Sequence, residues 1–150
     1  MRILLIDDEA SDDDKFRRGH YMWYYVNALR RAKHEVTVID NTDEAVEWLR
    51  KHAVDCIVLD VLMPPGKLFK NHPDANQGIN TGYLLARYLR DFAGIETSIV
   101  GLTHLVDDVT AELNRLSNVS CVLSKQECTP GHLLKVLDEL DVTTGPRNEF

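Results

Sequence analysis

Cysteine is scarce in this chain of 150 residues, with three cysteines at positions 56, 121 and 128. Because their number is odd and no Cys-x-x-Cys pair occurs, the sequence excludes a disulfide framework and a zinc knuckle and indicates a reducing compartment. Basic residues are also in the minority, since 17 Lys and Arg face 24 Asp and Glu for a formal charge of −7. This acidic balance offers no attraction to a phosphate backbone, so we expect no direct nucleic-acid binding.

Long hydrophobic runs are missing as well, and none approaches the roughly 20 residues that a membrane helix needs. The first apolar run, Ile3 to Ile6, is too short for the core of a signal peptide and leads directly into acidic residues. No Gly-x-Gly-x-x-Gly motif and no P-loop is present. The 44% of hydrophobic residues suffice for one core. We therefore expect a cytoplasmic protein without membrane insertion, forming a single domain over residues 1–150.

Short β-branched runs alternate with segments of helical period along the chain. The runs that predict strands are 2–6, 35–39, 56–59, 98–102 and 120–123. Several are apolar throughout, which is typical of strands covered on both faces. Right-handed crossovers between such strands predict an α/β fold of the flavodoxin-like kind, a doubly wound five-stranded parallel sheet with strand order 2-1-3-4-5 and helices on both faces.

The segments between these runs predict helices. The first helix is expected over roughly 21–33, with 9–20 as a polar loop or a frayed helical turn. Two helix starts carry capping signals, namely Asn41 with Glu44 three residues on, and Thr129 followed by Pro130. Two further helices are indicated by apolar stripes, which are Leu85, Tyr88, Leu89 and Phe92 in one and Val109, Leu113 and Leu116 in the other.

Polar residues follow the predicted strands at the edge where ligands bind in such sheets. Asp7 and Asp8 follow the first strand, Asp60 the third, Thr103 the fourth and Lys125 the fifth. Carboxylates brought together in this way repel one another unless a cation or a hard metal ion neutralises them, and oxygen ligands favour Mg²⁺. A lysine and a hydroxyl beside them suit an incoming phosphoryl group. Each residue alone is more typical of a turn, a helix cap or the surface than of a site, but their joint occurrence at successive strand ends favours a site.

The pattern resembles the receiver domains of two-component response regulators over nearly the whole chain. The resemblance rests on four segments, which are Ile6-Asp7-Asp8-Glu9, the stretch from Leu59 to Gly66 (Leu-Asp-Val-Leu-Met-Pro-Pro-Gly), Leu102-Thr103 and Ser124-Lys125. The Asp-x-x-Met-Pro signature within the second segment is the most specific of these. A stand-alone receiver similar to the chemotaxis regulators is the form that the chain resembles most.

The resemblance also implies roles for the residues in these segments. Asp60 would be the phosphoacceptor, and Mg²⁺ would be bound by Asp8, Asp60 and the main-chain carbonyl of Leu62, with Asp7 holding the metal through water. Lys125 would pair with the phosphoryl group, and Thr103 would bond to it on activation. The implied partners are a histidine kinase or phosphotransfer protein and a downstream protein target, with a homodimer left open. On this interpretation the protein is a signalling phosphoacceptor rather than an enzyme.

Four features depart from the usual receiver pattern. Val122 stands where an aromatic switch residue is usual, Gln126 replaces the proline after the lysine, and His104 follows Thr103 where a small residue is usual. A cis bond before Gln126 would cost about 3 kcal/mol, so the usual cis turn is either lost or strained. The fourth departure is a long segment at 67–81, which we interpret as a loop that could be a lid, a docking element or a passive excursion. A short tail is expected at 141–150.

The two positions that flank the path of water toward an acyl phosphate are Leu62 and Leu105. Neither side chain can orient a water molecule, so the hypothesis is slow self-dephosphorylation. Two rival functions remain open. A degenerate receiver could bind proteins without phosphorylation, and an aspartyl-nucleophile phosphohydrolase would need a second aspartate at position 62, where the chain has leucine.

Overall fold

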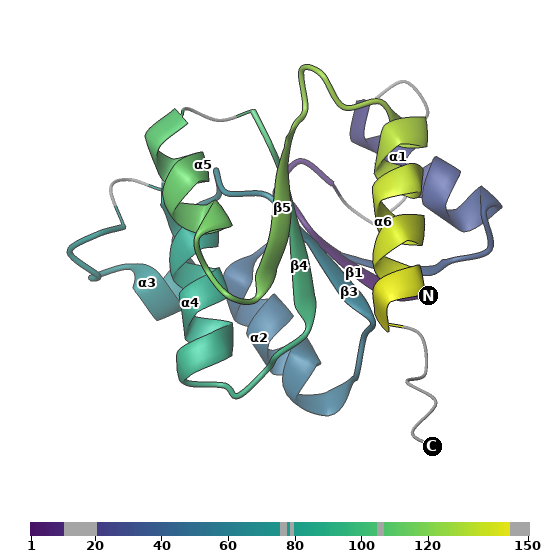
Figure 1. Ribbon diagram of the computed structural model, residues 1–150. Coiled ribbons are helices and arrows are strands. Elements are labelled where there is room, and N and C mark those ends of the chain that lie inside the picture. Colours follow the sequence, from purple (N-terminus) through teal and green to yellow (C-terminus); the bar gives the residue numbers. More distant parts are fainter. Residues whose placement is uncertain (11–20, 76–77, 79, 105–106, 145–150) are drawn as a thin grey trace.

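The computed structural model describes residues 1–10, 21–75, 78, 80–104 and 107–144 (Figure 1). Its sheet contains β1 (Arg2–Ile6), β2 (Glu35–Ile39), β3 (Cys56–Leu59), β4 (Ser98–Thr103) and β5 (Val119–Ser124). All neighbouring strands pair in parallel, in the order β2-β1-β3-β4-β5. The predicted fold class and strand order are therefore confirmed.

Helices cover both faces of this sheet (Figure 1). Their bounds are α1 (Tyr21–Arg31), α2 (Thr42–Lys51), α3 (Gly66–Phe69), α4 (Thr81–Asp91), α5 (Asp107–Asn114) and α6 (Pro130–Thr144). Helices α1 and α6 pack on one face over a cluster that includes Met22, Leu29 and Leu133, while α2, α4 and α5 cover the other with Leu49, Leu85 and Leu113. Within the described residues, no helix is long and apolar enough to cross a membrane.

Both predicted helix caps are present. The Asn41 side-chain oxygen accepts a hydrogen bond from the Glu44 amide at 2.8 Å, and the Thr129 hydroxyl accepts one from the His132 amide at 3.1 Å. Each bond satisfies an amide that has no partner inside its own helix, which fixes where α2 and α6 begin.

The structure corrects several predicted boundaries. Helix α1 ends at Arg31, two residues before the expected end, and Lys33 adopts a left-handed backbone with φ of 70°. Helix α6 continues to Thr144, so the tail predicted from 141 begins later. Phe92, predicted on the buried stripe of α4, lies just beyond the last helical residue and is 80% exposed. Most of the predicted loop at 9–20 lies outside the described residues.

The segment predicted as a loop at 67–81 begins with a helical turn, α3. Nothing in its own sequence caps this turn. Instead, the Asp43 carboxylate of α2 accepts hydrogen bonds from the amides of Lys67 and Leu68, both at 2.9 Å. The Thr42 hydroxyl adds a bond to the Pro65 carbonyl at 3.3 Å. Because the capping residue lies 24 and 25 positions away, local sequence gave no sign of α3.

Candidate functional site

The parallel register brings the residues predicted for the site to one edge of the sheet. Ile6 and Leu59 are the last residues of β1 and β3, and they pair in the sheet. Asp7 and Asp60, the residues that directly follow, therefore lie side by side. The Asp60 amide donates to the Ile6 carbonyl at 2.9 Å, and the Lys125 amide donates to the Thr103 carbonyl at 2.9 Å. Backbone hydrogen bonds therefore continue just past the strand ends. They fix the positions of Asp7, Asp60, Thr103 and Lys125.

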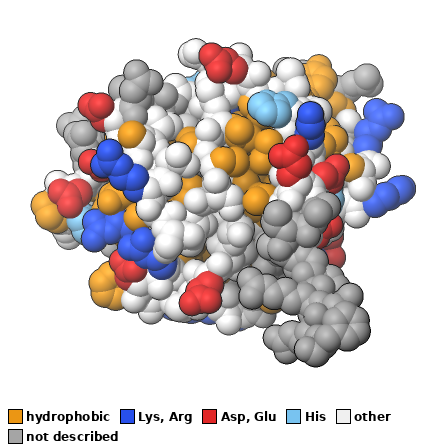
Figure 2. Space-filling view, in the orientation of Figure 1, with side chains coloured by type: hydrophobic (Ala, Val, Ile, Leu, Met, Phe, Trp, Pro, Cys, Tyr) orange, Lys and Arg blue, Asp and Glu red, His pale blue; other side chains and the backbone are white. Residues whose placement is uncertain are grey.

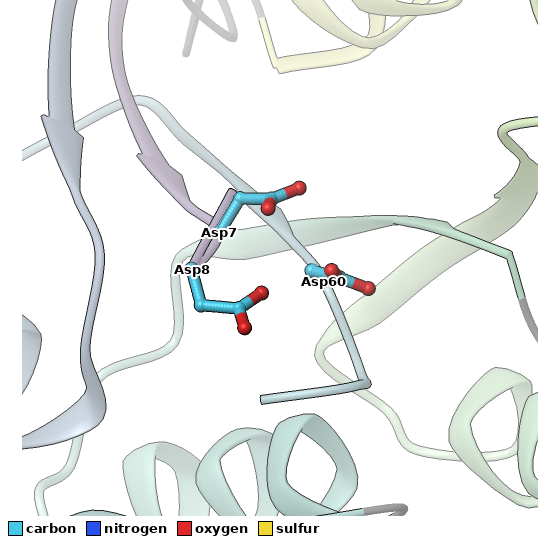
Figure 3. Close-up of side chains that lie close together, drawn as sticks. All are labelled: Asp7, Asp8 and Asp60. Atoms are coloured by element: carbon cyan, nitrogen blue, oxygen red, sulfur yellow. The ribbon is translucent and has the colours of Figure 1, made fainter. Parts of the chain in front are cut away.

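Three carboxylates gather at this edge, as Figure 3 shows where β1 and β3 end. One oxygen from each of Asp7, Asp8 and Asp60 lies within 4.8 Å of the others. Asp7 and Asp60 are buried, with 2% and 4% exposure, whereas Asp8 is exposed. Burial together with repulsion from Asp60 raises the pKa of Asp7 to about 6 against the opposing pull of Lys125. The pKa of Asp8 is raised for the same two reasons and also by Glu9.

Lys125 supplies the positive charge inside this acidic group. Its Nζ donates to Asp7 Oδ2 at 2.7 Å and to Asp60 Oδ2 at 3.2 Å, and its side chain is fully buried. Glu9 Oε2 lies 3.6 Å away. Burial alone would lower the pKa of Lys125, but the charges of Asp7 and Asp60 outweigh it and the pKa is raised. The ammonium therefore stays charged and balances part of the carboxylate charge.

Backbone amides hold the two buried carboxylates in fixed orientations. Asp60 Oδ1 accepts from the amides of Val61 at 2.7 Å and Leu62 at 3.3 Å. Asp7 Oδ1 accepts from the amide of Glu9 at 2.8 Å. In each residue one oxygen is tied to the main chain while the other faces Lys125. The role predicted for the Leu62 carbonyl stays a prediction.

Thr103 carries a buried hydroxyl that lacks a partner. The residue is 1% exposed, and its Oγ1 makes no hydrogen bond in the described part of the structure. Leaving such a group unsatisfied in the interior costs about 1–3 kcal/mol. Thr103 ends β4, and its carbonyl accepts from the Lys125 amide, so this unsatisfied hydroxyl belongs to the same sheet edge as the carboxylates. A donor without a partner there fits the predicted contact with a phosphoryl group.

Glycine at position 82 brings α4 against the chain that follows Asp60. The Gly82 amide donates to the Val61 carbonyl at 3.0 Å. A Cβ at this position would lie 2.4 Å from the Asp60 carbonyl oxygen and 2.5 Å from the Val61 Cα. Because both neighbours are backbone atoms, no larger residue fits without moving the segment that carries Asp60.

Tyr21, like Glu9, contacts Lys125 without having been predicted as a site residue. The Tyr21 hydroxyl accepts a hydrogen bond from Lys125 Nζ at 3.4 Å, and the centroid of its ring lies 5.4 Å from that nitrogen. The ring of His104, which is exposed, lies 5.6 Å from the Tyr21 ring. His104 is therefore a surface residue that packs beside Tyr21. No signal in the sequence could have placed Tyr21 here, because the pairing spans 104 positions.

The structure also locates two other residues at which the sequence departs from the usual receiver pattern, Val122 and Gln126. Val122 is half-buried on β5 and packs against the core under α2, α4 and α5. The bond between Lys125 and Gln126 is trans, as are the other peptide bonds of the described residues, so the usual cis turn is lost. Leu62 is 36% exposed, while Leu105 lies outside the described residues.

The donor set suits a magnesium ion. Carboxylate oxygens are the ligands that Mg²⁺ prefers, and it is bound in proteins by one or two carboxylates while keeping several waters. Asp8 and Asp60, with Asp7 beside them, provide such oxygens at one point, and exposed Asp8 leaves the site open to solvent. The residues present therefore fit the metal that the resemblance implies.

Solved structures of response regulators match this chain along almost its whole length. Chemotaxis protein CheY4 of Vibrio cholerae is 21% identical with a TM-score of 0.66, covering 93% of this chain and 97% of that chain. The receiver domain of Francisella response regulator 1452 is 22% identical with a TM-score of 0.67, covering 95% and 98%. A two-component response regulator from Clostridium difficile is 17% identical with a TM-score of 0.70, covering 97% and 98%.

The chain has the receiver fold. No protein-family model and no curated protein matches the sequence. At these identities the likeness establishes architecture, and the chemistry of the site has to be argued from its own residues. In this receiver fold the acidic edge at β1 and β3 is the candidate site.

Proposed function

We propose that this receiver-like protein is a signalling phosphoacceptor, in which Asp60 takes a phosphoryl group from a phosphohistidine on a partner kinase or phosphotransfer protein. The observation that carries the proposal is the ammonium of Lys125, buried between Asp7 and Asp60 at the sheet edge where Thr103 ends β4. A carboxylate and a cation in contact there, with a buried hydroxyl that has no partner among the described residues, support this role.

The chain's own residues account for the main steps. Asp60, held by two backbone amides, presents its carboxylate to phosphorus, and one of its oxygens forms the new P–O bond as the P–N bond to the histidine breaks. Lys125 neutralises charge that develops on the phosphoryl oxygens. Mg²⁺, held by Asp8 and Asp60 with Asp7 nearby, would supply further electrostatic stabilisation of that charge. The Leu62 carbonyl is the remaining proposed ligand.

The product would be an acyl phosphate on Asp60, whose phosphoryl group carries about −1.5 to −2 of charge at neutral pH in place of the single carboxylate charge. Its oxygens would draw in the Thr103 hydroxyl, which makes no hydrogen bond to any of the described residues. Because Thr103 ends β4 and Lys125 directly follows β5, a shift of either residue moves the segments that lead into α5 and α6. That displacement would present a changed surface to a downstream protein.

A small phosphodonor tests the proposal directly. The protein is incubated with acetyl phosphate and Mg²⁺, and its intact mass is measured. We expect an increase of about 80 Da, one PO₃H unit, that requires Mg²⁺ and is absent in Asp60→Asn. A folded wild-type protein that gains no mass would contradict the proposal and favour the rival binding module that works without phosphorylation. Steady turnover of a phosphomonoester would instead revive the phosphohydrolase, which exposed Leu62 at the general-acid position disfavours.

A further inference from the structure

An apolar groove lies between α3 and α4, apart from the acidic site. It encloses about 270 Å³. Its apolar lining consists of Leu68, Phe69, Leu84, Tyr88 and Phe92. Leu84 and Phe69 form a buried floor with 3% and 5% exposure, while Leu68 and Phe92 stand at the rim with 37% and 80%. Large apolar side chains exposed together in this way are typical of an interaction surface.

The segment that departs from the receiver pattern builds one wall of this groove. Helix α3 begins that segment, and Asp43 and Thr42 of α2 fasten it by three hydrogen bonds. The ring of Phe69 packs edge-on against Tyr88 of α4, with centroids 6.2 Å apart. These contacts fix α3 to the helices α2 and α4, so α3 is not a lid over the carboxylates. The groove between α3 and α4 is therefore preformed.

Arg87 gives the lining of the groove a positive charge, although the chain as a whole carries −7. Arg87 and His72 complete its lining, and no aspartate or glutamate contributes to it. Arg87 is exposed with its guanidinium over the Tyr83 ring at 5.6 Å, and no carboxylate of the described residues forms an ion pair with it. The nearby Asp91 is already bound by Arg90 through bonds of 2.6 and 3.1 Å. Figure 2 shows basic, acidic and hydrophobic side chains intermingled at the left of the view, where α3 and α4 lie.

We propose that this groove docks an amphipathic segment of a partner protein, which inserts apolar side chains between α3 and α4 and pairs an aspartate or glutamate with Arg87. The volume lies just below the usual range for small-molecule pockets, which begins at about 300 Å³, so it suits side chains of a peptide. A second copy of this chain is disfavoured because a symmetric contact would bring like charges of the same basic face together. The docking does not depend on phosphorylation of Asp60.

A peptide library identifies the preferred chemistry without assuming a partner. Random 12-residue peptides displayed on phage are selected on the unphosphorylated wild-type protein, after counter-selection on Arg87→Glu combined with Phe92→Asp. We expect enriched peptides that place apolar residues three or four apart and carry Asp or Glu beside them. A synthetic copy of one such peptide should shift the backbone amide resonances of Lys67–Lys70 and of Tyr83–Phe92.

Single variants then test the charge of Arg87 and the apolar rim of the groove separately. Arg87→Glu should weaken binding of the peptide at least about tenfold, which corresponds to about 1.4 kcal/mol. Rising salt should also weaken binding of the peptide. Arg31→Glu is the matched control, since this arginine is exposed at the end of α1 on the opposite face, and affinity should stay within about twofold. Phe92 is largely solvent-exposed, so Phe92→Asp tests the apolar rim without disturbing the core.

Four outcomes would overturn the proposal. These are failure to enrich any peptide over the counter-selection, peptides that lack acidic residues and tolerate Arg87→Glu, amide shifts confined to other surfaces, and self-association in sedimentation that Phe92→Asp abolishes. The last outcome would assign the groove to a second copy. Because no phosphodonor is used, each of these results is independent of whether Asp60 accepts a phosphoryl group.

Discussion

Asp8 is the least compensated carboxylate of the site. Asp7 and Asp60 both contact the Lys125 ammonium, but no ion pair joins Asp8 to a cation among the described residues. Burial and the charges of Asp60 and Glu9 raise its pKa, which means that ionised Asp8 is less favourable in the folded protein than in the unfolded chain. The site therefore holds more negative charge than is favourable for stability, as expected where a divalent cation completes it.

Replacing Asp8 by asparagine should separate stability from metal binding. Without Mg²⁺, Asp8→Asn should raise the free energy of unfolding by up to about 1 kcal/mol, because the change removes repulsion at a largely exposed position. The same variant should bind Mg²⁺ more weakly. Urea unfolding with and without Mg²⁺ measures both effects, and Asp40→Asn, an exposed aspartate at the end of β2, is the control. A loss of stability in Asp8→Asn without metal would contradict this view of the charge balance.

Thr103→Val tests the unpartnered hydroxyl. Valine has nearly the same shape and suits a strand, so we expect the free energy of unfolding to rise by about 1 kcal/mol as an unsatisfied buried group is removed. The response to beryllofluoride with Mg²⁺, followed by amide chemical shifts in β4 and β5, should shrink. If Thr103→Val is clearly destabilised instead, the hydroxyl has a partner in solution.

Leu62→Asn tests the lifetime of the proposed acyl phosphate. Leucine cannot orient an attacking water, whereas an amide can, so the variant should lose its phosphoryl group several-fold faster. Decay of the phosphorylated mass after removal of the donor gives the rate. Leu68→Asn, a similarly exposed leucine away from the carboxylates, should leave the rate unchanged. An unchanged lifetime in Leu62→Asn would mean that water reaches the acyl phosphate by another route.

At the scale of elements, the start of α4 is pressed against the chain that carries Asp60, and Gly82 permits this approach. Gly82→Ala should cost about 1–3 kcal/mol, because the added Cβ meets backbone atoms that cannot rotate away. Gly131→Ala is the matched control, since the nearest atom to its Cβ would be 3.9 Å away and alanine favours the helix. Thermal unfolding should show a lower melting temperature for Gly82→Ala and an unchanged or higher one for Gly131→Ala. Equal melting temperatures would mean that α4 moves aside freely.

The elements differ in how far the sequence predicts them. Continuous apolar runs predicted the strands closely, because strands covered on both faces have no polar alternation to obscure their ends. Helix ends were harder to predict, since periodicity places Phe92 on a buried stripe but does not reveal that α4 stops at Asp91. Helix α3 could not be foreseen, because its cap comes from Asp43 on another helix. At the site, strand ends predicted the position of Lys125, whereas the contact with Tyr21 depends on tertiary packing.

At the scale of the whole molecule, one side chain joins three strands, since Lys125 from the end of β5 contacts residues that follow β1 and β3. Lys125→Met should cost about 3–5 kcal/mol without Mg²⁺, because it leaves two buried carboxylates without their partner. Magnesium should recover a larger share of stability in this variant than in the wild type. Lys135→Met, an exposed lysine on α6, should change stability by less than about 0.5 kcal/mol. Chemical denaturation measures all three proteins, and equal stability of Lys125→Met and wild type would show that the ion pairs contribute nothing net.

The pairing of Lys125 with Asp7 spans 118 positions of the chain. During synthesis, Asp7 and Asp60 therefore emerge long before the residue that neutralises them, and contacts this distant in sequence form late in folding. A nascent or truncated chain that ends before β5 holds the carboxylates without their ammonium. The proposed phosphoacceptor site is thus complete only once β5 has been added to the edge of the sheet, so a chain that ends before β5 would lack the proposed activity.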